Sequence, residues 1–206
     1  MFVTFEGIEG SSKTTQAKLL SEWLTSLSIS HILTKEPGTP AVKECQKIRE
    51  LILNPESKIS SRTEFFLYLA DRSEHVEQCI LPAIANSQWV ICDRYVDSTK
   101  VYQGIGRGLG VDKIADMITF ASRNIMPDIT FIMDVPVEMG LGRARSSNTE
   151  FAGGDRMERE AEEFHNKLRQ GFLEIAGTHE RYVVLDARKS IEELHGEIRQ
   201  VLHKFV

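Results

Sequence analysis

The chain has few of the features that mark secreted, membrane or nucleic-acid-binding proteins. Its three cysteines, Cys45, Cys79 and Cys92, lack the even count and density of a secreted disulfide framework, and they show no metal-ligand spacing. No apolar run approaches the roughly 20 residues that cross a bilayer. The net charge of −5 argues against a broad basic face for nucleic acid or anionic lipid. We therefore expect a cytoplasmic protein that binds neither membrane nor nucleic acid.

The sequence also lacks internal repeats, low-complexity tracts and any linker rich enough in Pro, Gly or Ser to divide it. A chain of 206 residues that is 41% hydrophobic is long enough to bury one sizeable core. We therefore predict a single domain over residues 1–206.

Short apolar runs alternate with longer amphipathic stretches along the chain. The runs predict strands at Phe2–Phe5, His31–Thr34, Trp89–Cys92, Ile129–Met133 and Tyr182–Leu185. Such alternation is typical of a parallel sheet covered by helices, which is an α/β fold. The last helix is the best marked, because Ser190 and Glu193 have capping-box spacing before an apolar periodic stretch.

The residues after the first predicted strand have the composition of a phosphate-binding loop. Glycines let backbone N–H groups curl around phosphate oxygens, and the following helix N-terminus adds further donors. Lys13 would add a positive charge, and Thr14 would offer a hydroxyl to Mg²⁺. The motif G-x-x-x-x-G-K-[ST] has glycine where this chain has Ser12, so a plain strand-turn-helix connection stays an alternative. The predicted phosphate contacts are Gly7, Gly10, Ser11, Ser12, Lys13, Thr14 and Thr15.

Charged residues follow three further predicted strands, where open parallel sheets bind their ligands. The segments are Lys35–Gly38, Asp93-Arg94-Tyr95 and Asp134-Val135-Pro136. Each segment alone could simply cap a helix or end a strand. Together they predict a ring of charge at one sheet edge, with Asp93 placed to hold Mg²⁺ and Arg94 placed to hold phosphate oxygens.

Two later segments predict irregular structure near a site. Ser98–Gly108 combines a phenol, an amide, an arginine and glycines, which favours contact with a substrate. The glycine-rich and polar segments Gly104–Gly110 and Ser146–Gly154 predict loops over that site.

These segments, taken in order, resemble the thymidylate kinase family. The resemblance lies in Gly7–Thr15, Glu36-Pro37-Gly38, Leu69–Arg72, Asp93-Arg94-Tyr95, Ser98–Gly108, Pro127–Thr130 and Asp155–Glu158, and it covers essentially the whole chain. It implies a P-loop nucleoside-monophosphate-kinase fold, with a five-stranded parallel sheet flanked by helices on both faces. It further implies a homodimer that transfers the γ-phosphoryl group of ATP to dTMP with Mg²⁺, giving dTDP for dTTP biosynthesis.

The resemblance also implies a role for each matching residue. Lys13, the phosphate loop and Arg143 would bind ATP, while Thr14 and Asp93 would lie near the metal. Tyr68 would stack on thymine, although it could be an ordinary core residue, and Arg72 would hydrogen-bond the base edge. The implied dTMP contacts are Glu9, Glu36, Pro37, Tyr68, Arg72, Arg94, Ser98, Tyr102 and Gln103.

The loop itself supplies no transition-state arginine, so the chain resembles the bacterial type that carries such arginines in a lid. The lid would span about residues 143–156. Arg145 and Arg156, together with Lys13 and Arg94, would then be catalytic, because they would stabilise charge on the transferred phosphoryl group. Alternatively, Arg143 and Arg145 merely solvate a helix C-terminus.

Two other functions stay open. The chain could be an inactive nucleotide-binding scaffold, because Ser12 departs from the motif, or its acceptor could be another nucleoside monophosphate. If position 12 needs a glycine conformation, Ser12 stores strain of about 1–3 kcal/mol. We expect that strain to reduce the activity without abolishing it.

Overall fold

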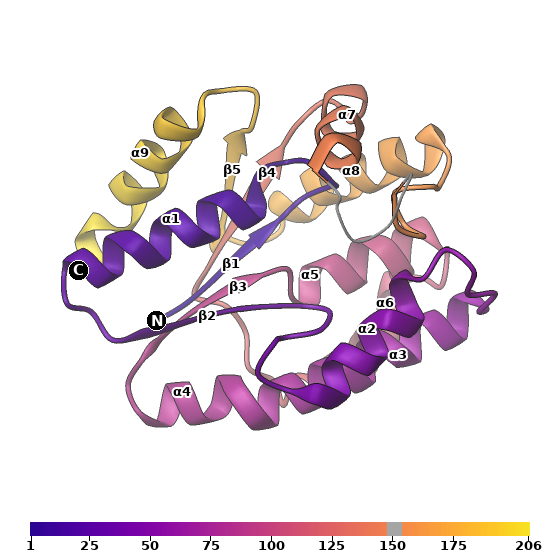
Figure 1. Ribbon diagram of the computed structural model, residues 1–206, viewed down its shortest axis with the longest axis horizontal. Coiled ribbons are helices and arrows are strands. Elements are labelled where there is room, and N and C mark those ends of the chain that lie inside the picture. Colours follow the sequence, from indigo (N-terminus) through magenta and orange to yellow (C-terminus); the bar gives the residue numbers. More distant parts are fainter. Residues whose placement is uncertain (148–153) are drawn as a thin grey trace.

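Five parallel strands form one sheet in the computed structural model, which describes residues 1–147 and 154–206 (Figure 1). Each strand begins at its predicted residue and extends one residue further, because pairing continues through the polar residue that ends the apolar run. The strands are β1 (Phe2–Glu6), β2 (His31–Lys35), β3 (Trp89–Asp93), β4 (Ile129–Asp134) and β5 (Tyr182–Asp186), in the order β2-β3-β1-β4-β5. The predicted α/β fold with a five-stranded parallel sheet is confirmed.

Helices cover both faces of this sheet (Figure 1). They are α1 (Lys13–Ser26), α2 (Lys43–Leu53), α3 (Ser61–His75), α4 (Leu81–Ala85), α5 (Val96–Thr99), α6 (Val111–Ala121), α7 (Val137–Ser147), α8 (Glu162–Ala176) and α9 (Ile191–Leu202). Helices α1 and α9 pack against each other on one face. The π-helical turns η1 (Val76–Ile80) and η2 (Lys100–Gly106) continue α3 and α5, and a 3-10 turn, η3 (His203–Phe205), ends the chain. In the described residues no helix is both long and apolar enough to cross a membrane.

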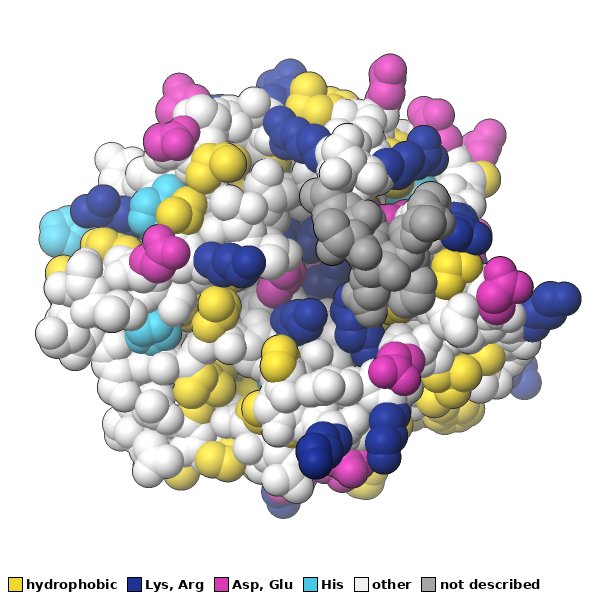
Figure 2. All heavy atoms as spheres, viewed as in Figure 1, with side chains coloured by type: hydrophobic (Ala, Val, Ile, Leu, Met, Phe, Trp, Pro, Cys, Tyr) yellow, Lys and Arg dark blue, Asp and Glu magenta, His cyan; other side chains and the backbone are white. Residues whose placement is uncertain are grey.

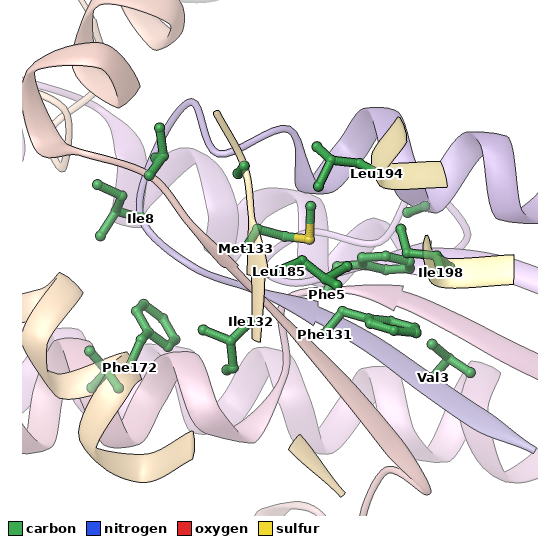
Figure 3. Packing of buried hydrophobic residues seen from close by; sticks show 14 of the residues in the cluster. Val3, Phe5, Ile8, Phe131, Ile132, Met133, Phe172, Leu185, Leu194 and Ile198 are labelled. Atoms are coloured by element: carbon green, nitrogen blue, oxygen red, sulfur yellow. The ribbon is translucent and has the colours of Figure 1, made fainter. Parts of the chain in front are cut away.

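The core lies on both faces of the central strands, as expected for a parallel sheet covered twice. Phe5 of β1 stacks on Phe131 of β4 with ring centroids 5.4 Å apart. Figure 3 shows Met133 on the side of α9, whereas the neighbouring Ile132 points toward Phe172 of α8. Successive side chains of β4 therefore pack against α9 on one face of the sheet and against α8 on the other.

The prediction of a loop at Gly104–Gly110 is wrong for its first three residues, which belong to η2. The glycines there serve close packing. A Cβ atom on Gly106 would lie 2.8 Å from Leu168 and 2.9 Å from Phe164, both in α8. The predicted loop Ser146–Gly154 begins inside α7 instead, and its residues 148–153 lie outside the described residues.

The capping box predicted for the last helix is confirmed. The Ser190 side chain accepts a hydrogen bond from the Glu193 backbone, and the Glu193 carboxylate accepts one from the Ser190 backbone. Buried Leu194, Ile198 and Leu202 fasten α9 to the sheet and α1. Helix α9 is therefore part of the scaffold rather than of the site.

Candidate active site

A cavity of about 270 Å³ lies at the carboxyl edge of the sheet. Lys and Arg side chains gather around a hollow in the middle of the face shown in Figure 2. Most of the predicted site residues line the cavity: Glu9, Gly10, Lys13, Thr14, Glu36, Pro37, Tyr68, Arg72, Asp93, Arg94, Ser98, Tyr102 and Gln103. The predicted segments Lys35–Gly38 and Asp93-Arg94-Tyr95 therefore converge on this cavity, whereas Asp134 is not among its lining residues and pairs with Arg169 of α8 at 2.6 Å.

The phosphate loop curls around the Lys13 side chain. The Lys13 ammonium donates hydrogen bonds to the Ile8 carbonyl at 2.6 Å and to Ser11 Oγ at 3.1 Å. Position 10 has no room for a side chain, because a Cβ atom there would lie 1.8 Å from the Gly140 carbonyl oxygen. Burial, and then the charge of Arg94, lower the pKa of Lys13 to about 7. The ammonium is thus a cation that a bound anion would stabilise.

Ser12 has the backbone conformation that its place in the motif suggested. Its φ is 69°, in the left-handed region that favours glycine, and its side chain caps no backbone N–H of α1. A side chain in this conformation costs about 1–2 kcal/mol. Beside it, Gly7 and Ser11 are buried in the loop, while Thr15 is exposed on the first turn of α1.

Thr14 and Asp93 form the expected pair of oxygen donors. Thr14 Oγ1 donates a hydrogen bond to the Asp93 carboxylate, which joins the start of α1 to the end of β3. Hydroxyl and carboxylate oxygens suit Mg²⁺, which needs only one or two protein ligands when it also binds phosphates. The part of the chain that the structure describes has no cluster of three or more His, Cys, Asp or Glu side chains that could hold a metal.

Arg94 spans the gap between the phosphate loop and the end of β3. Its Nη1 donates to the Gly7 carbonyl at 2.9 Å and to Ser98 Oγ at 3.2 Å, and its Nη2 donates to Glu9 at 3.0 Å. Its guanidinium carbon lies 5.0 Å from the ring centroid of Tyr102. Nearby Glu9 and the carbonyl of Gly7 hold this cation at the cavity wall.

Sequence reasoning missed Glu6, which fixes the segment that carries Arg94. Glu6 Oε1 accepts hydrogen bonds from the backbone N–H groups of Tyr95 at 2.8 Å and Ser98 at 3.2 Å. Burial, and then the nearby charge of Asp97, raise the pKa of Glu6 to about 7. A carboxylate at the end of a buried strand was the only signal in the sequence.

Arg72 is more deeply engaged with protein than its predicted contact with the base suggests. The side chain is 1% exposed and donates four hydrogen bonds, two to Glu36, one to Thr99 and one to the Tyr95 carbonyl. His75, which sequence reasoning also missed, contacts the other oxygen of Glu36 at 2.9 Å. Burial raises the pKa of Glu36, but Arg72 and His75 outweigh it and lower that pKa. Arg72 still lines the cavity, and one of its five N–H groups donates to none of the described residues.

The predicted aromatic contacts lie at the cavity wall. Tyr68 is half-buried there, and burial raises the pKa of its phenol. Tyr102 donates from its hydroxyl to Glu9 at 2.6 Å. Gln103 is buried and donates to Glu64 at 2.8 Å, so its amide is held by protein.

Glu64 is a buried carboxylate that sequence reasoning did not single out, and it pairs with Arg156, one of the predicted catalytic residues. It pairs with Arg107 at 3.0 Å and with Arg156 at 2.7 Å, and it accepts the bond from Gln103. Arg156 Nε also donates to the Ile52 carbonyl at 2.7 Å. Burial raises the pKa of Glu64, but Arg107 and Gln103 outweigh it and lower that pKa. The structure thus binds Arg156 to α3 and α2 rather than to the phosphate loop.

The other two predicted lid arginines lie on α7. Arg143 donates to the Ala187 carbonyl at 2.9 Å, and Arg145 is exposed in the last turn of the helix. Ala144, between them, lines the cavity. Their roles therefore stay predictions.

One further group reaches the site from α8. His165 is fully buried, and its Nδ1 lies 3.3 Å from Glu9 Oε2. Burial raises the pKa of Glu9, but neighbouring groups, the Arg94 and Lys13 cations among them, outweigh it and hold that pKa below the usual value. The Glu9 carboxylate is therefore an anion among cations and donors on three elements.

Known proteins resemble this chain along nearly its whole length. Residues 5–198 match the family model described as thymidylate kinase. A thymidylate kinase of Carboxydothermus hydrogenoformans is 45% identical over 201 residues, which are 98% of this chain and 96% of the relative. One of Cutibacterium acnes is 45% identical over 202 residues, which are 97% of this chain and 95% of the relative. The crystal structure of a thymidylate kinase from Ehrlichia chaffeensis superposes with a TM-score of 0.77 at 32% identity, covering 98% of both chains.

The Glu64 cluster predicts a large stability effect. We expect Glu64→Ala to lower the free energy of unfolding by about 3 kcal/mol, because Arg107 and Arg156 would lose their buried counter-ion. Urea denaturation measures the change. Glu163→Ala, at an exposed position of α8, is the matched control and should change stability by less than about 0.5 kcal/mol. A Glu64→Ala loss no larger than that of the control would contradict the prediction.

Proposed function

The chain belongs to the thymidylate kinase family, and we propose that the cavity at the carboxyl edge is where it transfers the γ-phosphoryl group of ATP to dTMP. The products are ADP and dTDP. The observation that carries this assignment is the placement of two cations, Lys13 and Arg94, on the walls of one cavity. Bringing two anionic phosphates together is the main barrier to such a reaction, and those cations lower it.

The donor side is built from the phosphate loop. Backbone N–H groups of Gly10 to Lys13 and the N-terminus of α1 would bind the ATP phosphates. The Lys13 ammonium would leave the Ile8 carbonyl for a phosphate oxygen, and burial makes that exchange favourable because it strengthens attraction to an anion.

The acceptor side is built from β3, α3 and η2. Arg94 would bind the dTMP phosphate, and Tyr68 offers a flat apolar surface for the base. Tyr102 lies between the Arg94 guanidinium and α8, where its ring would face the sugar. A bulky ring at that place favours a deoxyribose over a ribose, because a 2′-hydroxyl would need the same space.

Thr14 and Asp93 would hold Mg²⁺ beside the phosphates. Their oxygen atoms suit that ion, and their mutual hydrogen bond already brings them together. Bound Mg²⁺ would neutralise charge between the phosphates as they approach. The residues of this chain do the remaining work by orienting both nucleotides and excluding water.

Arg143, Arg145 and Arg156 are proposed to close over the phosphates as a lid. Arg156 would have to exchange Glu64 for a phosphoryl oxygen, and Arg143 would have to leave the Ala187 carbonyl. Residues 148–153, between them, lie outside the described residues. A cytoplasmic location stays a prediction of the sequence.

Turnover with different acceptors tests the function. A coupled assay with ATP and Mg²⁺ should show ADP formation that depends on dTMP and is much slower with dUMP, UMP, CMP or AMP. Preference for another acceptor would identify a different nucleoside monophosphate kinase. No turnover with any acceptor, despite ATP binding, would favour the inactive scaffold.

Arg94 carries a specific prediction about the acceptor. Arg94→Ala should raise the KM for dTMP about 100-fold, because a charged bidentate contact is worth about 3 kcal/mol, and should leave the KM for ATP within about threefold. Steady-state kinetics with each substrate varied in turn measures both constants. Arg123→Ala, which breaks the exposed pair with Glu77, is the control and should change neither. Equal losses for dTMP and ATP would contradict the assigned role.

We expect the backbone strain at Ser12 to lower the kcat/KM for ATP. Ser12→Gly should raise kcat/KM for ATP several-fold and stabilise the protein by about 1 kcal/mol, because glycine adopts a φ of 69° without strain. Ser28→Gly relieves the same kind of strain at a φ of 57° just beyond α1, and it should stabilise the protein without changing the kinetics. An unchanged kcat/KM in Ser12→Gly would remove the hypothesis.

Exposed apolar side chains on α2, α3 and α6 support the proposed homodimer. Leu51, Phe66, Met117 and Phe120 are exposed there, and Phe120 reaches 87%. Large exposed apolar surface of this kind marks an interface. Light scattering should give about twice the chain mass of 23.3 kDa. Phe120→Glu should give the monomer mass, and Ile191→Glu, at an exposed position on α9, should not; a monomeric unmodified protein would refute the dimer.

A further inference from the structure

His165 is a buried imidazole whose nitrogens are not satisfied by the described residues. It lies on α8 and is fully buried, and its Nε2 has no hydrogen-bond partner among the described residues. Nδ1 lies 3.3 Å from Glu9 Oε2, but the contact is not aligned as a hydrogen bond. Buried polar groups in folded proteins are nearly always paired, so an unpaired one calls for a reason. Of the two unpaired nitrogens, Nδ1 faces the Glu9 carboxylate of the active site.

We propose that His165 is a positioning residue that takes hold of the Glu9 carboxylate when the dTMP phosphate binds to Arg94. This inference rests on the proposed function, because it assumes that an acceptor phosphate arrives at Arg94. His165 itself touches no substrate in this scheme.

Glu9 binds Arg94, the residue that is proposed to bind the dTMP phosphate. Its Oε1 accepts hydrogen bonds from Arg94 at 3.0 Å and from the Tyr102 hydroxyl at 2.6 Å. Its Oε2 has no hydrogen bond from the described residues and faces His165. Oε1 therefore accepts hydrogen bonds from Arg94 and Tyr102, which are proposed to contact dTMP. Oε2 lies near His165 Nδ1 but accepts no hydrogen bond from it.

A bound phosphate would compete with Glu9 for Arg94. Nη1 of Arg94 is already committed to the Gly7 carbonyl and Ser98, so the acceptor phosphate would share the remaining N–H groups with Glu9. Two anions close together in a partly buried site repel strongly. Repulsion falls if the carboxylate turns away from the phosphate and gains a donor on its other side.

His165 is the group best placed to be that donor. A small rotation of the Glu9 carboxylate would align Oε2 with Nδ1–H, which either the Nδ1–H tautomer or the imidazolium can offer. The charged and titratable groups around this pair are Arg94, Lys13, Tyr102 and Asp155, which act on Glu9 from four other segments. Lys13 donates to Ile8 and Ser11 and would turn to the ATP phosphates when ATP binds, so it does not replace His165.

The inference predicts an effect that depends on the phosphate of the ligand. Thymidine has the same base and sugar as dTMP but brings no anion to Arg94, so its binding does not require Glu9 to turn. Loss of the His165 donor should therefore weaken dTMP and spare thymidine. A merely structural role would weaken both.

Calorimetric binding of dTMP and thymidine to the full chain tests this. His165→Leu, which fills the site without a donor, should weaken dTMP about tenfold and leave thymidine within about twofold. His165→Asn, whose side-chain N–H lies where Nδ1–H was, should restore most of the dTMP affinity. His203→Asn, on the exposed end of the chain, is the control and should change neither ligand.

The outcomes separate the inference from the proposed function. Equal losses for dTMP and thymidine, or no loss for either, would overturn the role of His165 and leave the kinase assignment standing. Failure of the unmodified protein to bind dTMP would overturn both. If His165→Leu does not fold, nuclear magnetic resonance of the unmodified protein decides: saturation with dTMP, but not with thymidine, should produce a slowly exchanging imidazole N–H signal that disappears in His165→Asn. Absence of that signal would overturn the proposal.

Discussion

The pairing of β1 with β3 is the constraint on which the rest of the site depends. Phe5 is in register with Asp93, and the Arg94 backbone N–H donates to the Phe5 carbonyl at 3.0 Å. Parallel pairing makes both strands end at one edge, so the phosphate loop and the Asp93-Arg94-Tyr95 segment leave the sheet side by side. The Glu6 side chain then ties the second segment to the first by accepting hydrogen bonds from the backbone N–H groups of Tyr95 and Ser98. Thr14 and Asp93, which are 79 positions apart, and Gly7 and Arg94, which are 87 positions apart, thus come into contact because a short stretch of paired strand aligns them.

Most of the cations described around the site are held by a carboxylate or carbonyl of the protein. Glu9 holds Arg94, Glu36 holds Arg72, and Glu64 holds Arg107 and Arg156. Buried ion pairs of this kind contribute little net stability but cost a great deal if one partner is lost. Binding two anionic nucleotides must therefore exchange internal partners rather than simply add contacts. The unengaged imidazole of His165 beside Glu9 is what such an exchange requires on the acceptor side.

Much of the fold follows from local pattern. All five strands begin where the apolar runs begin, and the Ser190–Glu193 capping box starts α9 as its spacing indicates. Most of the site residues also line the cavity, because strand order and motif order bring them to the same edge. What local pattern did not predict is which buried groups pair over long range. Arg156 binds Glu64, 92 positions earlier, and nothing in either neighbourhood indicates that choice. Gly104–Gly106 is composed like a loop but is helical, and its glycines allow close packing, Gly104 against α6 and Gly106 against α8.

The sequence by itself determined the class of fold, the phosphate loop, and the cations and carboxylates available to the site, since these depend on residue type and spacing along the chain. Tertiary structure alone decided which charges neutralise one another, which arginines are engaged with protein, and that a histidine of α8 faces the loop after β1. The physical reason is that charge pairing in a low-dielectric interior is set by distances of about 3 Å between groups far apart in sequence. Periodicity reports which face of an element is buried, but it does not report what that face meets.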